Sequence, residues 1–429
     1  MTHHTFPGVD AFRSADSGRL RVLYDGLFAR IHEKESSLRV FASVQPRISR
    51  ILEELDACIR RFPDAQTKPP LFGVPVGVKA LLRMTGYPTR CGSLLPADLF
   101  EGPESAIVSL LRKSGAIPFA LTATAEFGSP EPPATANPHN PAHTPGGSSS
   151  GSAAGVAAGF FPLAVGSQTI GSVIRPAAYC GVTGFKPSFG VLPTKGQVYF
   201  SRSADHAGLF TATPAEMSAV FHALMPERRA EAVTYAIRLG VPVGPYLDQV
   251  QAEALAHFNA TLKRLAGLKV EVVEVPCLED ITGIAERHHD MITAEFAEEH
   301  SDYFVRYEAL YRPRTAEMLR HGQKQGRTAV ERGNSSQREL RERLQAKMNE
   351  HGLHAWATPA AVGEAEKGLL NTGDPCMNMP WTHAGVPVLT FPTGRGSQNL
   401  PLGIQLAGAF GEDDALLAVG CALYDLLAH

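Results

Sequence analysis

Three short stretches of this 429-residue chain carry residues whose types and spacing could perform chemistry. Lys79 follows the apolar run 72–78, where burial would disfavour its charge and lower its pKa from about 10.4. A loop rich in glycine and serine covers 144–152, and a second turn of small residues covers 166–172. A neutral lysine could act as a base, and a serine facing a nest of backbone N–H groups could act as a nucleophile.

Each stretch alone also has an ordinary explanation. Lys79 could be a surface lysine whose stem lies along apolar residues at a strand end. The 144–152 loop could be a flexible linker, and 166–172 a plain turn. A phosphate-binding loop is excluded because the chain there lacks both G-x-x-x-x-G-K-[ST] and G-x-G-x-x-G. The linker is disfavoured because a small-residue helix at 153–159 and a candidate strand at 163–165 follow immediately.

The elements that must position these stretches alternate between strands and helices. Residues 14–62 have helical spacing, 72–78 predicts a buried strand, and 106–114 predicts an amphipathic helix. The apolar segment 117–121 predicts a parallel strand, and 413–427 predicts a final helix. This alternation predicts an α/β sandwich.

The middle of the chain differs from the rest. Residues 240–350 are mainly helical in pattern and strongly charged, except for KVEVVEV at 269–275, which predicts a strand at one sheet edge. A linker between domains is not evident. We therefore expect one domain over residues 1–429, with an N-terminal helical segment (about 1–65) and a divergent helical region on the substrate side (about 240–350).

Composition limits the classes of function. The 40 basic and 43 acidic residues give a net charge of −3, which indicates neither a nucleic-acid surface nor a polybasic membrane patch. The apolar runs are shorter than the roughly 18 residues of a membrane span, and the N-terminus lacks the pattern of a secretory signal. Six cysteines without a C-x-x-C pair are typical of a reduced protein, so we expect a cytoplasmic location.

Taken together and in this order, the three stretches resemble the amidase signature family. Its pattern is a strand-borne lysine, a G-G-S-S-G-G-S-like loop, and a G-G-S-like turn 24 residues after the first serine of that loop. Ser172 lies 24 residues after Ser148, and Lys79 occupies the place of the family's lysine. The resemblance covers about residues 65–425 and is weakest over 240–350. Its further matches are residues 180–187, 205–208, 373–382, 385–387 and 401–406.

The resemblance implies an α/β/α fold with a mixed central β-sheet covered by helices, and a catalytic triad. Ser172 would be the nucleophile that forms an acyl-enzyme. Ser148 would relay its proton to neutral Lys79 and later to the leaving amine. In the family the peptide bond that enters the relay serine is cis, so we expect a cis Gly147–Ser148 bond.

The resemblance also implies where the substrate lies. Backbone N–H groups would hold the oxyanion, and these belong to Thr169, Ile170, Gly171 and Ser172. Three further residues would contact the substrate, namely Gly147, Ser149 and Arg175.

The sequence departs from the family pattern within the turn. Ile170 replaces a glycine and would narrow the acyl pocket, and Gln168 stands where many members have aspartate. Arg175 lies three residues after the nucleophile rather than two. With Gln168 and Thr169 ahead of it, this arrangement resembles the branch that includes malonamidase, where the arginine binds the carboxylate of the substrate. Arg175 could instead brace the turn through backbone carbonyls.

The leading hypothesis is an amidohydrolase that cleaves small, carboxylate-bearing amides to an acid and ammonia. Three rivals stay open: the ammonia-generating subunit of glutamyl-tRNA amidotransferase, an allophanate- or carboxybiuret-type ureide hydrolase, and a non-catalytic binding protein. We expect no cofactor and no metal, because the histidine pairs at 3–4 and 288–289 lack suitably spaced partners and should be solvent-exposed. We expect two kinds of partner: a small-molecule amide substrate and, in a homodimer, a second copy of the chain.

Overall fold

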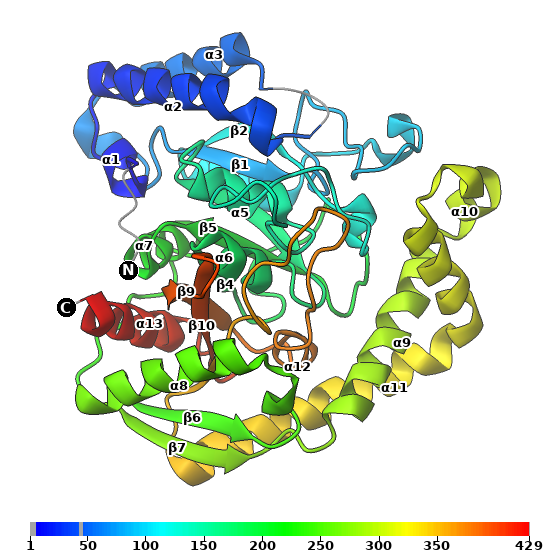
Figure 1. Ribbon diagram of the computed structural model, residues 1–429. Coiled ribbons are helices and arrows are strands. Elements are labelled where there is room, and N and C mark those ends of the chain that lie inside the picture. Colours follow the sequence, from blue (N-terminus) through cyan, green and yellow to red (C-terminus); the bar gives the residue numbers. More distant parts are fainter. Residues whose placement is uncertain (1–5, 43–45, 429) are drawn as a thin grey trace.

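A mixed β-sheet of ten strands runs through the computed structural model, which describes residues 6–42 and 46–428 (Figure 1). The strand order is β2-β1-β3-β5-β4-β9-β10-β8-β6-β7. Parallel pairs lie at the two ends of the sheet, and the pairs from β3 to β8 are antiparallel. The strands are β1 (Pro75–Lys79), β2 (Ile117–Thr122), β3 (Leu163–Gln168), β4 (Thr183–Lys186), β5 (His206–Thr211), β6 (Arg238–Val243), β7 (Glu271–Pro276), β8 (Ala355–Pro359), β9 (Val388–Arg395) and β10 (Pro401–Ala407).

Helices precede, separate and follow these strands. They are α1 (Val9–Arg13), α2 (Ser17–Leu38), α3 (Ile48–Arg61), α4 (Ala106–Lys113), α5 (Ser150–Ala157), α6 (Ile174–Cys180), α7 (Pro214–Leu224), α8 (Ala252–Gly267), α9 (Ile281–Glu299), α10 (Ser301–Tyr307), α11 (Pro313–His351), α12 (Met379–His383) and α13 (Asp413–Ala428). None of the described helices is both long and apolar enough to cross a membrane.

Successive residues of β9 show that helices cover both faces of the sheet. Leu389 lies against Gly420 of α13, whereas Thr390 lies beside Gly184 and close to Ala177 of α6. Because neighbouring strand residues point to opposite faces, α13 and α6 lie on opposite sides of the sheet. The predicted α/β sandwich is therefore confirmed.

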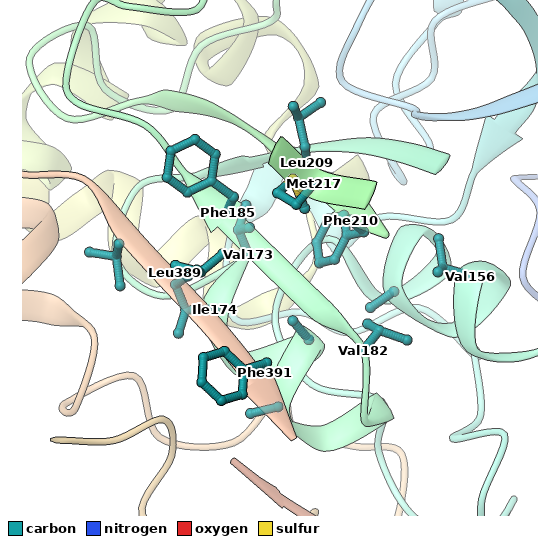
Figure 2. Close-up of a cluster of buried hydrophobic side chains, with 14 of the residues drawn as sticks. Val156, Val173, Ile174, Val182, Phe185, Leu209, Phe210, Met217, Leu389 and Phe391 are labelled. Atoms are coloured by element: carbon teal, nitrogen blue, oxygen red, sulfur yellow. The ribbon is translucent and has the colours of Figure 1, made fainter. Parts of the chain in front are cut away.

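A buried apolar cluster holds the turn that carries Ser172 (Figure 2). Val173 and Ile174, the two residues after that serine, are fully buried among Phe185, Leu209 and neighbouring side chains. Close packing of this kind tolerates little displacement. The turn is therefore fixed at its C-terminal end by the core of the sheet.

Several predicted elements are confirmed by the structure. Residues 117–121 fall within β2, which is parallel to β1, and residues 269–275 overlap β7 at the sheet edge. The pattern did not predict β6, because Gly240 and Pro242 weaken the strand signal there.

Two helices of the middle region, α9 and α11, lie side by side along one flank of the molecule (Figure 1). Their close approach depends on Gly322 of α11. A Cβ atom at this glycine would come within 1.8 Å of the carbonyl oxygen of Thr293 in α9. Four residues later, Gly326 interrupts the helical backbone with φ +65°.

We therefore expect Gly322→Ala to destabilise the protein by about 1–3 kcal/mol, the usual cost of overpacking. Gly267→Ala, at the end of α8, is the matched control because a Cβ there meets open space. Alanine in a helix is favoured over glycine by roughly 0.5–1 kcal/mol, so this control should be neutral or stabilising. Urea unfolding midpoints of the two variants measure the difference, and equal midpoints would contradict the packing argument.

Candidate active site

Lys79 is the last residue of β1, and its side chain is fully buried. Its Nζ lies 2.7 Å from Ser148 Oγ and 2.9 Å from Ser167 Oγ. Burial lowers the pKa of Lys79 to about 7, although the nearby Asp205 carboxyl acts in the opposite direction. The surface-lysine explanation is therefore wrong, and a neutral amine is available near pH 7.

The 144–152 loop reaches Lys79 through two glycines in left-handed conformations, Gly146 (φ +81°) and Gly147 (φ +59°). A Cβ at Gly147 would press on Pro176 and on the backbone of Ser172, so only glycine lets the loop approach the turn this closely. The loop then enters α5, where the Ser150 hydroxyl donates to the Gly147 carbonyl at 2.8 Å. It is a packed structure rather than a flexible linker.

The expected cis Gly147–Ser148 bond is wrong, since none of the described peptide bonds is cis. The two left-handed glycines turn the chain with a trans bond, which a non-proline residue favours by about 3–4 kcal/mol. In this conformation of the loop, the backbone N–H of Ser148 donates to Ser172 Oγ at 3.1 Å. The hydroxyl of Ser148 instead contacts Lys79.

The structure does not support the expected contacts of Ser149 and Gly147 with substrate. The buried Ser149 hydroxyl donates to the Ser167 carbonyl at 3.1 Å and accepts from the Ser167 N–H at 3.3 Å. It joins the loop to β3 and is not among the residues that line the pocket. Gly147 donates its N–H to the Thr372 carbonyl at 3.0 Å, and its carbonyl is used by Ser150.

Gln168 anchors the start of the second turn. Its Oε1 accepts the N–H groups of Val173 and Ile174 at 2.7 and 3.0 Å, and its Nε2 donates to Thr382 Oγ1 at 2.8 Å. An amide oxygen thus satisfies two free N–H groups at the beginning of α6. The glutamine also supplies a donor, which an ionised aspartate lacks.

Ser172 lines a pocket of about 280 Å³ together with Ser148 and the turn residues from Thr169 to Gly171. Within the described chain, the N–H groups of Ile170, Gly171 and Ser172 donate to no protein acceptor. Donors that are left free beside a half-buried serine suit a developing oxyanion. Ile170 lies in the wall of the pocket.

Arg175 lies in the same pocket wall and is 3% exposed. Its Nε donates to the Thr372 carbonyl at 2.7 Å, and its Nη2 lies 3.4 Å from Thr372 Oγ1. The buried Nη1 has no hydrogen-bond partner. Among the described residues, the Asp374 and Glu366 carboxylates act on the guanidinium only from beyond ion-pair distance. One edge of the guanidinium therefore braces the chain, while one nitrogen is left free.

Sequence reasoning missed other residues of this site. Met318 and His289 reach the pocket from α11 and α9, and Phe200 reaches it from the loop before β5. The helical periodicity of 240–350 contains no signal for which side chains face a pocket. Asp205 was recognised only as part of a family match. Its carboxylate binds Thr169 Oγ1 at 2.5 Å and the Phe200 N–H at 2.8 Å.

The 288–289 histidine pair was predicted to be exposed, and this is wrong for His288, which is 1% exposed. Residues 3–4 lie outside the described chain. His289 is exposed, and its ring forms a group with Asp290 and His321 in which the ligand atoms lie within 4.8 Å. Asp290 already pairs with Arg332 at 2.7 Å, so the carboxylate that a cation would need is engaged within the protein.

The family model described as Amidase matches residues 25–417. The chain belongs to the amidase family. As an amidase it is a hydrolase of carbon–nitrogen bonds. It is 30% identical to a glutamyl-tRNA(Gln) amidotransferase subunit of Synechococcus sp. (strain WH7803), over 93% of this chain and 92% of that protein. The corresponding subunit of Neisseria meningitidis serogroup A / serotype 4A (strain DSM 15465 / Z2491) is 26% identical, with 97% and 96% covered.

Solved structures agree with this assignment. A crystal structure of an amidase has a TM-score of 0.86 at 28% identity, covering 95% of this chain and 97% of that chain. An inhibitor-bound structure from work on a vestigial complex and the origins of an s-triazine catabolic enzyme has a TM-score of 0.85 at 25% identity, with 98% of both chains covered. The expected amidase signature fold is confirmed.

The amidase should respond to loss of the Asp205 charge through the pKa of Lys79. The carboxylate raises this pKa, so Asp205→Asn should lower it and increase the neutral fraction of Lys79 in acid. With neutral Lys79 as the base, the acid limb of kcat/KM for amide hydrolysis moves to lower pH. Asp413→Asn is the control, because that carboxyl is buried beside Lys186 instead. An unchanged acid limb in Asp205→Asn would contradict the electrostatic coupling.

Proposed function

We propose that this amidase hydrolyses small amides through an acyl-enzyme on Ser172, releasing an acid and ammonia. The observation that carries the proposal is the 2.7 Å contact between fully buried Lys79 and Ser148, which lines the same pocket as Ser172. A lysine that burial keeps partly neutral is a base, and a half-buried serine beside free N–H groups is a nucleophile. Lys79 is the last residue of β1, so the lysine and the serine that it contacts lie at the C-terminal end of that strand.

In the proposed reaction, Ser172 Oγ attacks the amide carbonyl while its proton passes to Ser148, whose own proton passes to Lys79. Free N–H groups of the turn stabilise the negative charge that develops on the carbonyl oxygen. When the intermediate collapses, the carbon–nitrogen bond breaks and the leaving nitrogen takes a proton from Ser148, which Lys79 replenishes. Water then cleaves the ester of Ser172 by the same steps.

The relay has one contact present and one that must form. Lys79 already hydrogen-bonds the Ser148 hydroxyl, whereas Ser172 Oγ accepts the Ser148 backbone N–H. We propose that the contact between the two hydroxyls forms when substrate binds, as catalytic hydrogen bonds often tighten only in the complex. The N–H donor also favours the ionised form of the nucleophile, because it stabilises negative charge on Oγ.

We further propose that the substrate carries a carboxylate, as in the malonamidase-like branch. Arg175 supports this, because it lines the pocket, its buried guanidinium remains charged at neutral pH, and its Nη1 has no hydrogen-bond partner. A buried charge without an ionic partner is costly, and an anionic substrate would offset that cost. The bracing contacts with Thr372 use the other edge of the same group.

A second candidate is the ammonia-generating subunit of an amidotransferase. Relatives described as glutamyl-tRNA(Gln) amidotransferase subunits support it, because they align over nearly the whole chain. Co-purification of partner subunits with a tagged chain, together with glutamine-dependent ammonia release, distinguishes this role from that of an independent amidase. Ureides such as allophanate belong in the same substrate panel, since their cleavage needs the same chemistry.

The domain and assembly predictions are also part of the proposal. One sheet that spans the chain from β1 to β10 supports a single amidase domain over residues 1–429. Met318 and His289 support a substrate-side role for the region 240–350, because both line the pocket. A homodimer remains to be tested by light scattering.

We expect Ser172→Ala to abolish ammonia release, because alanine removes the hydroxyl that becomes acylated. Losses in such triads reach many orders of magnitude, on the order of 10⁶ in kcat. The circular dichroism spectrum and Tm should stay close to wild type. Ammonia release by Ser172→Ala at the wild-type rate would exclude the mechanism, and an inactive wild-type enzyme on a broad amide panel would favour the binding-protein rival.

Arg175→Ala tests the preference for acidic amides. It should cost about 1.5–3 kcal/mol of binding to a carboxylate-bearing amide such as malonamate, the range for a hydrogen bond to a charged group. The same variant should lose less activity on a neutral amide of equal size, because only the bracing contacts with Thr372 are then removed. Measurement of kcat/KM on the matched pair of substrates decides this, and equal losses on both would assign Arg175 to the scaffold alone.

A further inference from the structure

A buried chain of hydrogen bonds connects the helical flank of the molecule to the turn before Ser172. His288 of α9 places its Nε2 3.1 Å from the carbonyl oxygen of Thr169. Its Nδ1 lies 3.0 Å from Nδ1 of His383 in α12, and His383 Nε2 lies 3.0 Å from Ser336 Oγ in α11. Arg287 closes the chain by donating its Nε–H to Ser336 Oγ at 2.9 Å.

The direction of this chain follows from what each atom can do. A carbonyl oxygen only accepts, so the Nε2 of His288 carries its proton and its Nδ1 must accept. His383 therefore donates from Nδ1 and accepts at Nε2 from the Ser336 hydroxyl. Burial lowers the pKa of His288 to about 4 and that of His383 to about 2, which keeps both rings neutral. Only one arrangement of protons satisfies all four contacts.

The next carbonyl of the turn is held in the same manner by another side chain. Thr382 Oγ1 donates to the Ile170 carbonyl at 2.6 Å and accepts the Gln168 Nε2–H at 2.8 Å. Two consecutive carbonyls, those of Thr169 and Ile170, therefore point toward donors on α9 and α12. In a trans peptide the carbonyl and the following N–H point in opposite directions.

The N–H groups of Ile170 and Gly171 consequently point away from these donors, and both residues line the pocket beside Ser172. A flip of the Thr169–Ile170 peptide would replace an oxyanion donor by a carbonyl acceptor. Such a flip would also leave the buried Nε2–H of His288 without a partner, which costs about 1–3 kcal/mol. The buried chain thus favours the donor orientation before any substrate arrives.

We propose that His288, oriented by His383, is a positioning residue that keeps the Ile170 N–H directed into the pocket for the oxyanion. This inference rests on the proposed function, in which the turn stabilises a tetrahedral intermediate. His288 touches neither the substrate nor the nucleophile. Its contribution is the direction of one peptide group.

The test compares His288→Gln with His288→Met on an amide that the wild type hydrolyses. Methionine removes the donor, so kcat should fall about 10- to 100-fold, less than the roughly 10²–10³-fold cost of deleting an oxyanion donor. KM should change little, because the oxyanion forms only in the transition state. Glutamine can place an N–H near the position of Nε2 and should restore most of kcat.

His300→Met is the matched control for the loss of a buried histidine. His300 lies between α9 and α10, is 1% exposed, and bonds Tyr311 through Nδ1 at 2.8 Å, without contact to the turn. It should lower Tm but leave kcat close to wild type. A second pair of variants keeps the test valid if His288→Met folds poorly. His383→Asn keeps a donor to His288 and should retain most of kcat, whereas His383→Leu removes the donor and should lower kcat.

The outcomes separate this inference from the function on which it rests. Wild-type kcat in His288→Met and His383→Leu, or equal losses in His288→Gln and His288→Met, would overturn the positioning role while leaving Ser172→Ala inactive. Turnover by Ser172→Ala would instead overturn the proposed function. Long-range ¹H–¹⁵N spectra of the folded enzyme should show the Nε2–H tautomer for His288 and the Nδ1–H tautomer for His383. The reverse tautomers would contradict the proposed direction of the hydrogen bonds between Thr169, His288, His383 and Ser336.

Discussion

The burial of Lys79 is the constraint on which the rest of the site depends. An ammonium group removed from water is costly, so the protein lowers its pKa to about 7 and surrounds it with hydroxyl and carbonyl oxygens from Ser148 and Ser167. Burial of Lys79 also requires that water is excluded from the C-terminal end of β1. The neighbouring strands β2 and β3 and the packed 144–152 loop surround this end. Asp205 adds a compensating charge at a distance and keeps the pKa from falling further.

Around Lys79 the chain controls the direction of backbone groups rather than adding charged side chains. Gly146 and Gly147 bring the loop against the turn, and Gln168 and Thr382 hold the turn from behind. The contacts of Gln168 and Thr382 each satisfy a buried polar group, and they leave the N–H groups of Ile170, Gly171 and Ser172 free. The result is a preorganised row of free N–H donors, which is the arrangement that lowers an oxyanion barrier without reorganisation.

The sequence predicted many of the elements, because helical and strand periodicities are local signals. The resemblance to the family pattern, with its 24-residue serine spacing, singled out Lys79, Ser148 and Ser172. Lys79, Ser148 and the Ser172 turn lie together at the C-terminal ends of the neighbouring parallel strands β1 and β3. The expected cis Gly147–Ser148 bond was wrong, because Gly146 and Gly147 turn the chain here in left-handed conformations with a trans bond. Ser149 was misplaced because its partner is a carbonyl of β3.

The features that could not be predicted from the sequence depend on contacts between residues far apart in the chain. His288 and His383 are 95 residues apart and meet only because α9 packs against α12. Neither histidine belongs to a recognisable motif. His288 is followed by a second histidine in a strongly charged helix, which led us to expect that both are exposed. Likewise, Met318 faces the pocket because Gly322 lets α11 lie close to α9, a relation that no local pattern encodes.

The most direct test of the central claim is the pH dependence of labelling by a fluorophosphonate, which reacts only with an activated serine. We expect peptide mapping to find the label on Ser172. The labelling rate should rise with pH to a plateau, with an apparent pKa near 7 that reflects Lys79. Lys79→Arg should not be labelled, because a guanidinium does not give up its proton. Labelling at another residue, or a rate unaffected by Lys79→Arg, would contradict the account.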